Sequence, residues 1–176
     1  SFYHSLPEKP DIVICVFGLL GDQREAHQSW SQAEDIINSN YTGAVSILNI
    51  AANDFEQRKK GLIVGISSVA GERGRQSNYI YGSAKAGFTA YLSGLRNRLY
   101  HHGVHVVTVK PGFVRTKMIE NLSTPGLLTA SPKQVAERIS KAIRRKKDTL
   151  YVLQIWSLVM FVIRVIPESI FKKLKL

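Results

Sequence analysis

Near-continuous apolar stretches recur along the chain and are separated by amphipathic segments. Residues 11–16 read DIVICV, which is the pattern of a strand that is buried on both faces. Similar runs predict three further strands, at residues 61–68, 104–110 and 149–153. A proline and a glycine at positions 111 and 112 break the third of these runs.

The segments between the apolar runs carry helical signals. Residues 31–55 predict a helix, because Ser31 and Glu34 form a capping-box pattern ahead of apolar positions at helical spacing. A second helix is expected over residues 79–102, where a glycine follows in the C-cap position. A serine and a proline begin a third, which runs from residue 131 to about residue 146.

Strands and helices that alternate at this spacing form parallel βαβ units with right-handed crossovers. The sequence therefore predicts an α/β fold, with a parallel sheet flanked by helices. In an open sheet of this kind, ligands bind beyond the carboxyl ends of the strands. The loops after Val16, Ser68 and Lys110 all fall on that edge, and we expect the chemistry to lie there.

Charge and composition narrow the choice of partner. The formal net charge of +11, from 24 Lys and Arg against 13 Asp and Glu, favours an anionic partner such as a phosphorylated substrate or a membrane surface. Favourable charge near helix C-termini accounts for the excess equally well. We expect no nucleic-acid partner, because no binding motif accompanies the charge. We also expect no metal site, because His101, His102 and His105 lack carboxylate or cysteine neighbours at ligand spacing.

The end of the chain differs in character from the rest. Residues 154–176 form an apolar and basic tail, which we separate from a catalytic domain over residues 1–153. The apolar part, Ile155–Ile163, is shorter than the ~20 residues that cross a bilayer. We expect a helix packed on the sheet or on a partner subunit, with interfacial membrane contact as the alternative. The single cysteine, Cys15, favours a reducing, cytoplasmic location.

Tyr81 and Lys85 are the first candidates for catalysis. They lie four residues apart near the start of a predicted helix, so their side chains share one face. A phenol has a pKa of about 10, and a nearby ammonium favours the phenolate and lowers that pKa. The pair alone is weak evidence, because a surface tyrosine with a lysine neighbour gives the same pattern.

Two polar residues strengthen the case. Ser68 ends a buried strand thirteen residues before Tyr81, where its hydroxyl could bond a carbonyl oxygen or merely the local backbone. Asn40 lies within a predicted helix, where asparagine has low propensity, and is either functional or simply exposed to solvent. The segment after the third strand, PGFVRT over residues 111–116, lies on the same edge of the sheet.

In this order, Asn-x-x-Gly, ISS, Tyr-x-x-x-Lys and PGxVxT resemble the short-chain dehydrogenase/reductase family. The resemblance implies that Tyr81 exchanges the proton at the substrate oxygen and that Ser68 polarises the carbonyl. It implies that Lys85 binds the nicotinamide ribose and lowers the pKa of Tyr81, and that Asn40 holds a water in a proton relay. It also implies NADP or NAD as cofactor and a homo-oligomer. The implied cofactor-binding residues are Gly18, Lys85, Pro111, Gly112, Val114 and Thr116.

The chain departs from the family pattern in two places. The family usually has Asn-Asn-Ala-Gly after its fourth strand, whereas this chain has Cys15, Val16, Phe17 and Gly18. The glycine-rich phosphate loop and the residue that selects NAD or NADP are absent. We therefore expect the C-terminal half of a Rossmann-like doubly wound sheet, lacking its first three strands, which leaves residues 11–16 as an exposed apolar edge. Such a fragment alone should bind NAD(P)H negligibly.

Several segments suggest a closer relationship. FGLLGD, NYTGAVS, SSVAGERGRQSN, VRTKM and IPESIFKKL resemble the decaprenylphosphoryl-2-keto-ribose (erythro-pentofuranosid-2-ulose) reductases. This resemblance implies a keto-sugar carried on a polyprenyl phosphate as substrate, with a small or acyl-carrier-bound ketone, or a catalytically silent scaffold, as alternatives. Four cations on two loops are candidates for contacting the substrate phosphate: Arg73, Arg75, Arg115 and Lys117.

Overall fold

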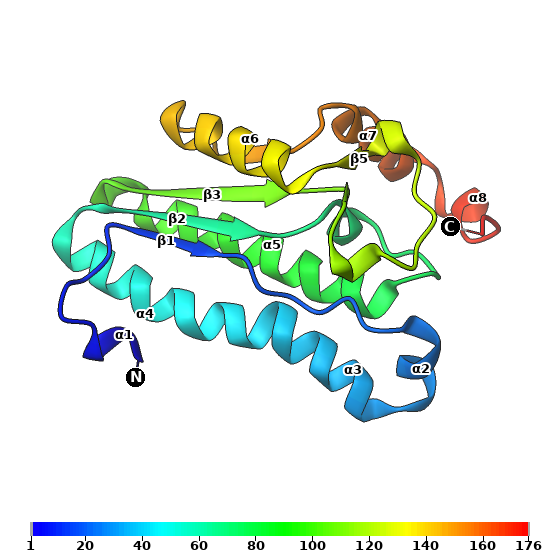
Figure 1. Ribbon diagram of the computed structural model, residues 1–176, viewed down its shortest axis with the longest axis horizontal. Coiled ribbons are helices and arrows are strands. Elements are labelled where there is room, and N and C mark those ends of the chain that lie inside the picture. Colours follow the sequence, from blue (N-terminus) through cyan, green and yellow to red (C-terminus); the bar gives the residue numbers. More distant parts are fainter. Residues whose placement is uncertain (1, 176) are drawn as a thin grey trace.

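A four-stranded parallel sheet forms the centre of the protein, which confirms the predicted α/β class (Figure 1). The computed structural model describes residues 2–175. The strands lie in the order β1-β2-β3-β6. Their bounds are Ile12–Cys15 for β1, Gly61–Ile66 for β2, Val104–Lys110 for β3 and Thr149–Tyr151 for β6. Strand β3 has the predicted bounds, and each of the other three strands is two residues shorter than the predicted run.

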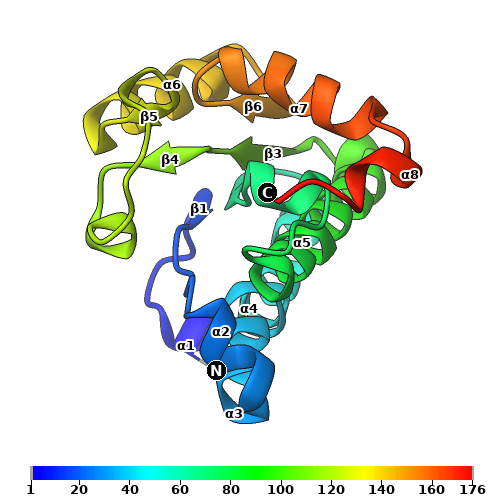
Figure 2. The ribbon, with the colours of Figure 1, turned by 90° about the vertical axis from the view of Figure 1, so that its right-hand side faces the viewer.

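Helices cover both faces of this sheet (Figure 2). On one face lie α4 (Gly43–Arg58) and α5 (Tyr79–Leu99), and on the other lies α6 (Pro132–Arg144). The remaining elements are short or lie outside these layers. They are the helices α1 (Phe2–Ser5), α2 (Gln23–Gln28), α3 (Trp30–Ile37), α7 (Ile155–Val165) and α8 (Glu168–Phe171), and a small parallel pair, β4 (Phe113–Val114) and β5 (Thr129–Ala130).

Successive side chains of a strand point to opposite faces of the sheet, so each strand contributes to the core on both faces. On β2, Ile63 packs with the residues of α4 and α5, while its neighbour Val64 packs with those of α6. Val106 and Val107 divide in the same way on β3, and all four side chains have no exposed surface. Burial on both faces is the reason that these strands read as continuous apolar runs.

Strand β1 lies at the edge of the sheet, as expected from the sequence. Its only strand partner among the described residues is β2. Ile12 and Ile14 remain 49% and 47% exposed. Apolar side chains and unpaired backbone groups on an edge strand are suited to pairing with another strand.

The start of the first long helical segment differs from the prediction. Ser31 is not an N-cap, because α3 begins at Trp30 after Ser29, and Ser29 makes no side-chain capping bond. A helix that the sequence analysis missed, α2, precedes it and is capped by Asp22, whose carboxylate accepts from the N–H groups of Arg24 and Glu25. The capping signal expected at residue 131 is present, as a reciprocal capping box between Ser131 and Gln134.

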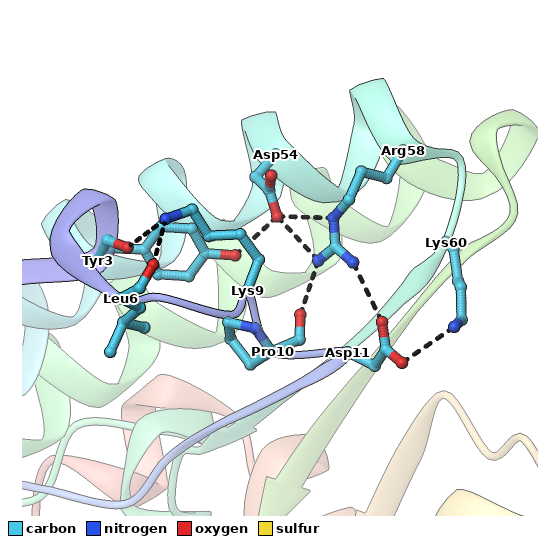
Figure 3. A network of polar contacts seen from close by, with 8 residues as sticks. All are labelled: Tyr3, Leu6, Lys9, Pro10, Asp11, Asp54, Arg58 and Lys60. Atoms are coloured by element: carbon cyan, nitrogen blue, oxygen red, sulfur yellow. Dashed lines mark hydrogen bonds and ion pairs between the residues drawn. The ribbon is translucent and has the colours of Figure 1, made fainter.

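A polar network ties the N-terminal segment to the end of α4 (Figure 3). The guanidinium of Arg58 lies between Asp54 and Asp11, at 2.8 and 3.0 Å, and donates to the carbonyl of Pro10. The Tyr3 hydroxyl donates to Asp54 at 2.8 Å, and burial raises the pKa of Tyr3 to about 12. These bonds hold in place the segment that leads into β1. They thereby also help to position the loop that follows β1.

The apolar tail packs on the carboxyl edge of the sheet. Trp156 and Met160 of α7 are buried against Val69 and Phe113, and the Trp156 indole N–H donates to the carbonyl of Leu128 at 3.0 Å. The opposite side of α7 stays exposed. No helix within residues 2–175 combines the length and apolar character needed to cross a bilayer.

Gly112 shows how closely α7 approaches the loop after β3. A Cβ atom at position 112 would overlap the indole of Trp156. We therefore expect Gly112→Ala to lower the free energy of unfolding by about 1–3 kcal/mol, because the ring must shift. Gly126→Ala is the control, since a Cβ there meets nothing within 4 Å, and it should change stability by less than about 0.5 kcal/mol. Equal stabilities of the two variants in chemical denaturation would contradict this packing.

Candidate active site

A cavity of about 470 Å³ opens at the carboxyl edge of the sheet. It collects eight of the residues singled out in the sequence. They are Gly18, Ser68, Tyr81, Lys85, Pro111, Gly112, Val114 and Thr116. All six expected cofactor-binding residues therefore line one cavity together with three of the four expected catalytic residues.

Ser68 and Tyr81 reach this cavity from neighbouring elements. Ser68 follows β2 in an extended conformation, and its hydroxyl accepts a hydrogen bond from the Ala70 N–H at 3.1 Å. Tyr81 lies in the first turn of α5, and burial raises the pKa of its phenol. The Ser68 side chain is close enough to oppose this rise in part. The phenol is therefore neutral, and able to donate a proton, at neutral pH.

Lys85 is buried beside Tyr81, and its expected lowering of the Tyr81 pKa stays a prediction. Its ammonium lies 5.8 Å from the centroid of the Tyr81 ring and donates to the carbonyl of Ile66 at 3.0 Å. The residue is only 4% exposed, and burial lowers the pKa of Lys85 to about 8. An ammonium carries three donors, so two remain available beyond the bond to Ile66.

Asn40 lies behind the cavity rather than on its wall. It is buried in a π-helical turn, Asn38–Thr42, between α3 and α4. Its amide nitrogen donates to the carbonyls of Leu19 and Ile36 at 2.6 and 2.8 Å. Its Oδ1 is buried and has no hydrogen-bond partner among the described residues. A π-helical turn often marks a functional position in a helix, and here it orients the asparagine.

Gly18 forms the link between Asn40 and Lys85. A Cβ at this position would lie 2.6 Å from Asn40 Oδ1 and 3.2 Å from Lys85 Nζ. Only glycine leaves this space free. The unpaired oxygen, the two free donors of Lys85 and the open backbone at Gly18 fit a dinucleotide ribose with a water behind it. The residues present therefore suit the expected cofactor.

The four cations expected to contact substrate lie in three different places. Arg75 lines the catalytic cavity. Arg115 and Lys117 line a neighbouring cavity of about 520 Å³ that contains none of the expected catalytic residues. The two cavities share Thr116, Ile119 and Leu122. Arg73 lines neither of these cavities, and it donates to carbonyls in the last turn of α7 and to the carbonyl of Ile166.

The sequence analysis missed several residues of the cavity. Trp156, from the tail, forms part of its wall, and no local pattern placed that side chain near Gly112. Apolar residues from the segment after Thr116 and from α6 complete the wall: Met118, Ile119, Leu122, Val135, Ala136 and Ile139. The spacing of apolar residues in α6 indicated that the helix packs on the sheet, but it did not indicate that the helix lines the cavity.

The lowered pKa of Lys85 has a measurable effect on stability. Because the folded-state pKa is about 8 against an ordinary 10.5, the unfolded chain binds more protons between these pH values, and stability rises with pH in that window. Lys85→Met removes this dependence. Its stability relative to the wild type should therefore fall from pH 8 to pH 10.5, by up to about 3 kcal/mol.

Urea denaturation across this pH range measures the difference. Lys133→Met, at an exposed position on α6, reports the general effect of losing one lysine. If the difference in stability between Lys85→Met and the wild type stays constant from pH 8 to pH 10.5, this result would contradict a buried ammonium.

Comparison with known proteins places these features in a family. A family model described as short chain dehydrogenase matches residues 7–125. The chain is 36% identical over 163 residues to an uncharacterised oxidoreductase of Mycobacterium tuberculosis, covering 92% of this chain and 64% of that protein. It is 32% identical over 148 residues to a ketoacyl reductase of Nostoc, covering 82% and 52%.

A solved structure agrees with the architecture. A short chain dehydrogenase from Burkholderia cenocepacia in complex with NADP superposes with a TM-score of 0.78 at 20% identity, covering 92% of this chain and 67% of that one. The chain spans 64% of the length of the first of these curated relatives. With a family model that matches more than half of its residues, the chain belongs to the short chain dehydrogenase family.

Proposed function

We propose that the protein reduces a ketone to a secondary alcohol with NADPH or NADH. The observation that carries this proposal is the convergence of Ser68, Tyr81 and Lys85 on one cavity that also contains the expected cofactor-binding residues. The dinucleotide, when bound, supplies a hydride to the carbonyl carbon. The name of the similar Nostoc protein, a ketoacyl reductase, supports a ketone as the reacting group.

The residues of the chain provide the acid half of this reaction. The Ser68 hydroxyl donates to the carbonyl oxygen and polarises it, and the Tyr81 phenol gives its proton to the developing alkoxide. The raised pKa of Tyr81 keeps the proton in place before the reaction. The Lys85 donors that do not bond Ile66 would hold the ribose hydroxyls of the cofactor. Asn40 Oδ1, which has no partner within residues 2–175, would anchor a water that returns a proton to the site.

Tyr81→Phe tests the role of the phenol directly. We expect turnover to fall by about 10²- to 10⁴-fold, because the change deletes the proton donor and little else. Tyr79→Phe is the matched control, since Tyr79 lies two residues away, is 45% exposed and stacks on His27. It should keep its activity within about twofold. Ketone-dependent NADPH or NADH oxidation by Tyr81→Phe at the wild-type rate would remove Tyr81 as the acid.

Our finer proposal for the substrate is a keto-sugar on a polyprenyl phosphate. The sequence segments that resemble such reductases support it, as does the apolar wall that Met118, Leu122 and Trp156 give the cavity. The relatives described above carry no name of this kind. An acyl-carrier-bound ketone is the second candidate, and the ketoacyl reductase of Nostoc favours it.

A substrate panel separates these two candidates. The protein is assayed for NADPH and NADH oxidation with a prenyl-phosphate-linked keto-pentose, a 3-oxoacyl thioester and a small neutral ketone. On our proposal kcat/KM is at least tenfold higher for the keto-pentose than for either other ketone. A preference for the thioester would instead favour the second candidate.

Oligomeric state and location remain proposals as well. Leu158, Phe161, Val162 and Val165 are half or more exposed on α7. This apolar surface would suit the expected homo-oligomer or the expected peripheral membrane contact of a cytoplasmic protein.

A further inference from the structure

Arg75 is a partly buried cation that has no counter-charge within the described part of the chain. Its side chain lines the catalytic cavity, and its Nε is buried without a hydrogen-bond partner among residues 2–175. No carboxylate of the described residues forms an ion pair with it. Burial lowers the pKa of Arg75, yet a guanidinium keeps its charge under all ordinary conditions. The energetic cost of this arrangement falls if an anion binds beside it.

The two charged side chains that precede Arg75 on this loop, Glu72 and Arg73, have partners elsewhere and do not neutralise it. Arg73 stacks on the Phe171 ring at 3.7 Å and pairs with Glu168 at 2.9 Å. The carboxylate of Glu72 accepts from Lys110 at 3.1 Å and from the Tyr151 hydroxyl. Arg75 is therefore the one guanidinium of this loop that faces the cavity.

The position of Arg75 along the chain places it on the substrate side of the cavity. The loop that carries it connects Ser68 to Tyr81, the two residues that meet the reacting carbonyl in our proposal. Asn78, at the end of this loop, also lines the cavity, and its buried Oδ1 lacks a partner among the described residues. Arg75 Nε is thus a donor, and Asn78 Oδ1 an acceptor, without a partner among the described residues. This pair suits a ligand that carries an oxyanion and a hydroxyl group.

We propose that Arg75 is the specificity-determining residue of this site and selects ketones that carry an oxyanion, a carboxylate or a phosphate. Arg75 donates to the oxyanion through its planar fork, while Asn78 accepts from a substrate hydroxyl. This inference rests on the proposed function for its ketone, but the oxyanion subsite exists independently of turnover. The proposal also predicts that a neutral ketone of equal size binds less well, because it leaves the partly buried Arg75 unpaired.

Direct binding tests the subsite without any reaction. Calorimetric titrations with benzoate and phenyl phosphate, and with benzamide as the neutral counterpart, are compared for the wild type, Arg75→Met and Arg75→Lys. We expect Arg75→Met to weaken binding of both anions at least tenfold and to change benzamide binding less than twofold. Arg75→Lys keeps the charge but loses the planar fork, so its affinity for both anions should lie between those of the wild type and Arg75→Met. The ratio of benzoate to phenyl phosphate affinity shows which oxyanion the subsite prefers.

Kinetics provide the second measurement. The ratio of kcat/KM for a keto acid to that for its methyl ester should fall at least tenfold in Arg75→Met. Arg138→Met, which removes an exposed arginine of α6, controls for net charge and should leave the ratio unchanged. If no ketone is turned over while anion binding still depends on Arg75, the proposed function fails and the subsite stands. Anion binding that is equal in the wild type and Arg75→Met overturns the subsite.

Discussion

The buried ammonium of Lys85 is the constraint around which the site is arranged. A charge that is 96% removed from solvent must be met by oxygen atoms, and the carbonyl of Ile66 at the end of β2 provides the first. This bond joins α5 to the carboxyl edge of the sheet. It also brings the ammonium beside Gly18, where a side chain would displace it. The loop after β1, the end of β2 and α5 thus meet at a single cation.

The fold was predictable where burial on both sides makes a strand continuous in its apolar character. Ile63 and Val64, or Val106 and Val107, must both be apolar because one faces each layer of helices. The pairing of Tyr81 with Lys85 was predictable for a similar reason, since the helical repeat alone puts them on one face. Both features depend on the repeat of a strand or of a helix, and these repeats can be recognised directly in the sequence.

Features decided by distant contacts were not predictable. Ser31 had the residue pattern of a cap, but the N-cap of α3 is Ser29, two residues earlier, where α2 precedes the helix and Ala33 and Ile36 pack in a buried cluster. Arg73 and Arg75 are the same residue type two positions apart. Arg73 is held by carbonyl groups of Ile163 and Ile166, about ninety residues further along the chain, whereas Arg75 has no such partner among the described residues. Nothing near either arginine in the sequence distinguishes them.

The pKa values of Tyr81 and Lys85 bear on the proposed reduction. Burial raises the pKa of the Tyr81 phenol and lowers that of the Lys85 ammonium, so each group is driven toward its neutral form. A neutral phenol is the form that protonates an alkoxide, whereas oxidation of an alcohol requires the phenolate. At neutral pH Tyr81 keeps its proton, while Lys85, with a pKa of about 8, remains mostly charged. In the proposed reduction, this burial keeps on Tyr81 the proton that the alkoxide receives.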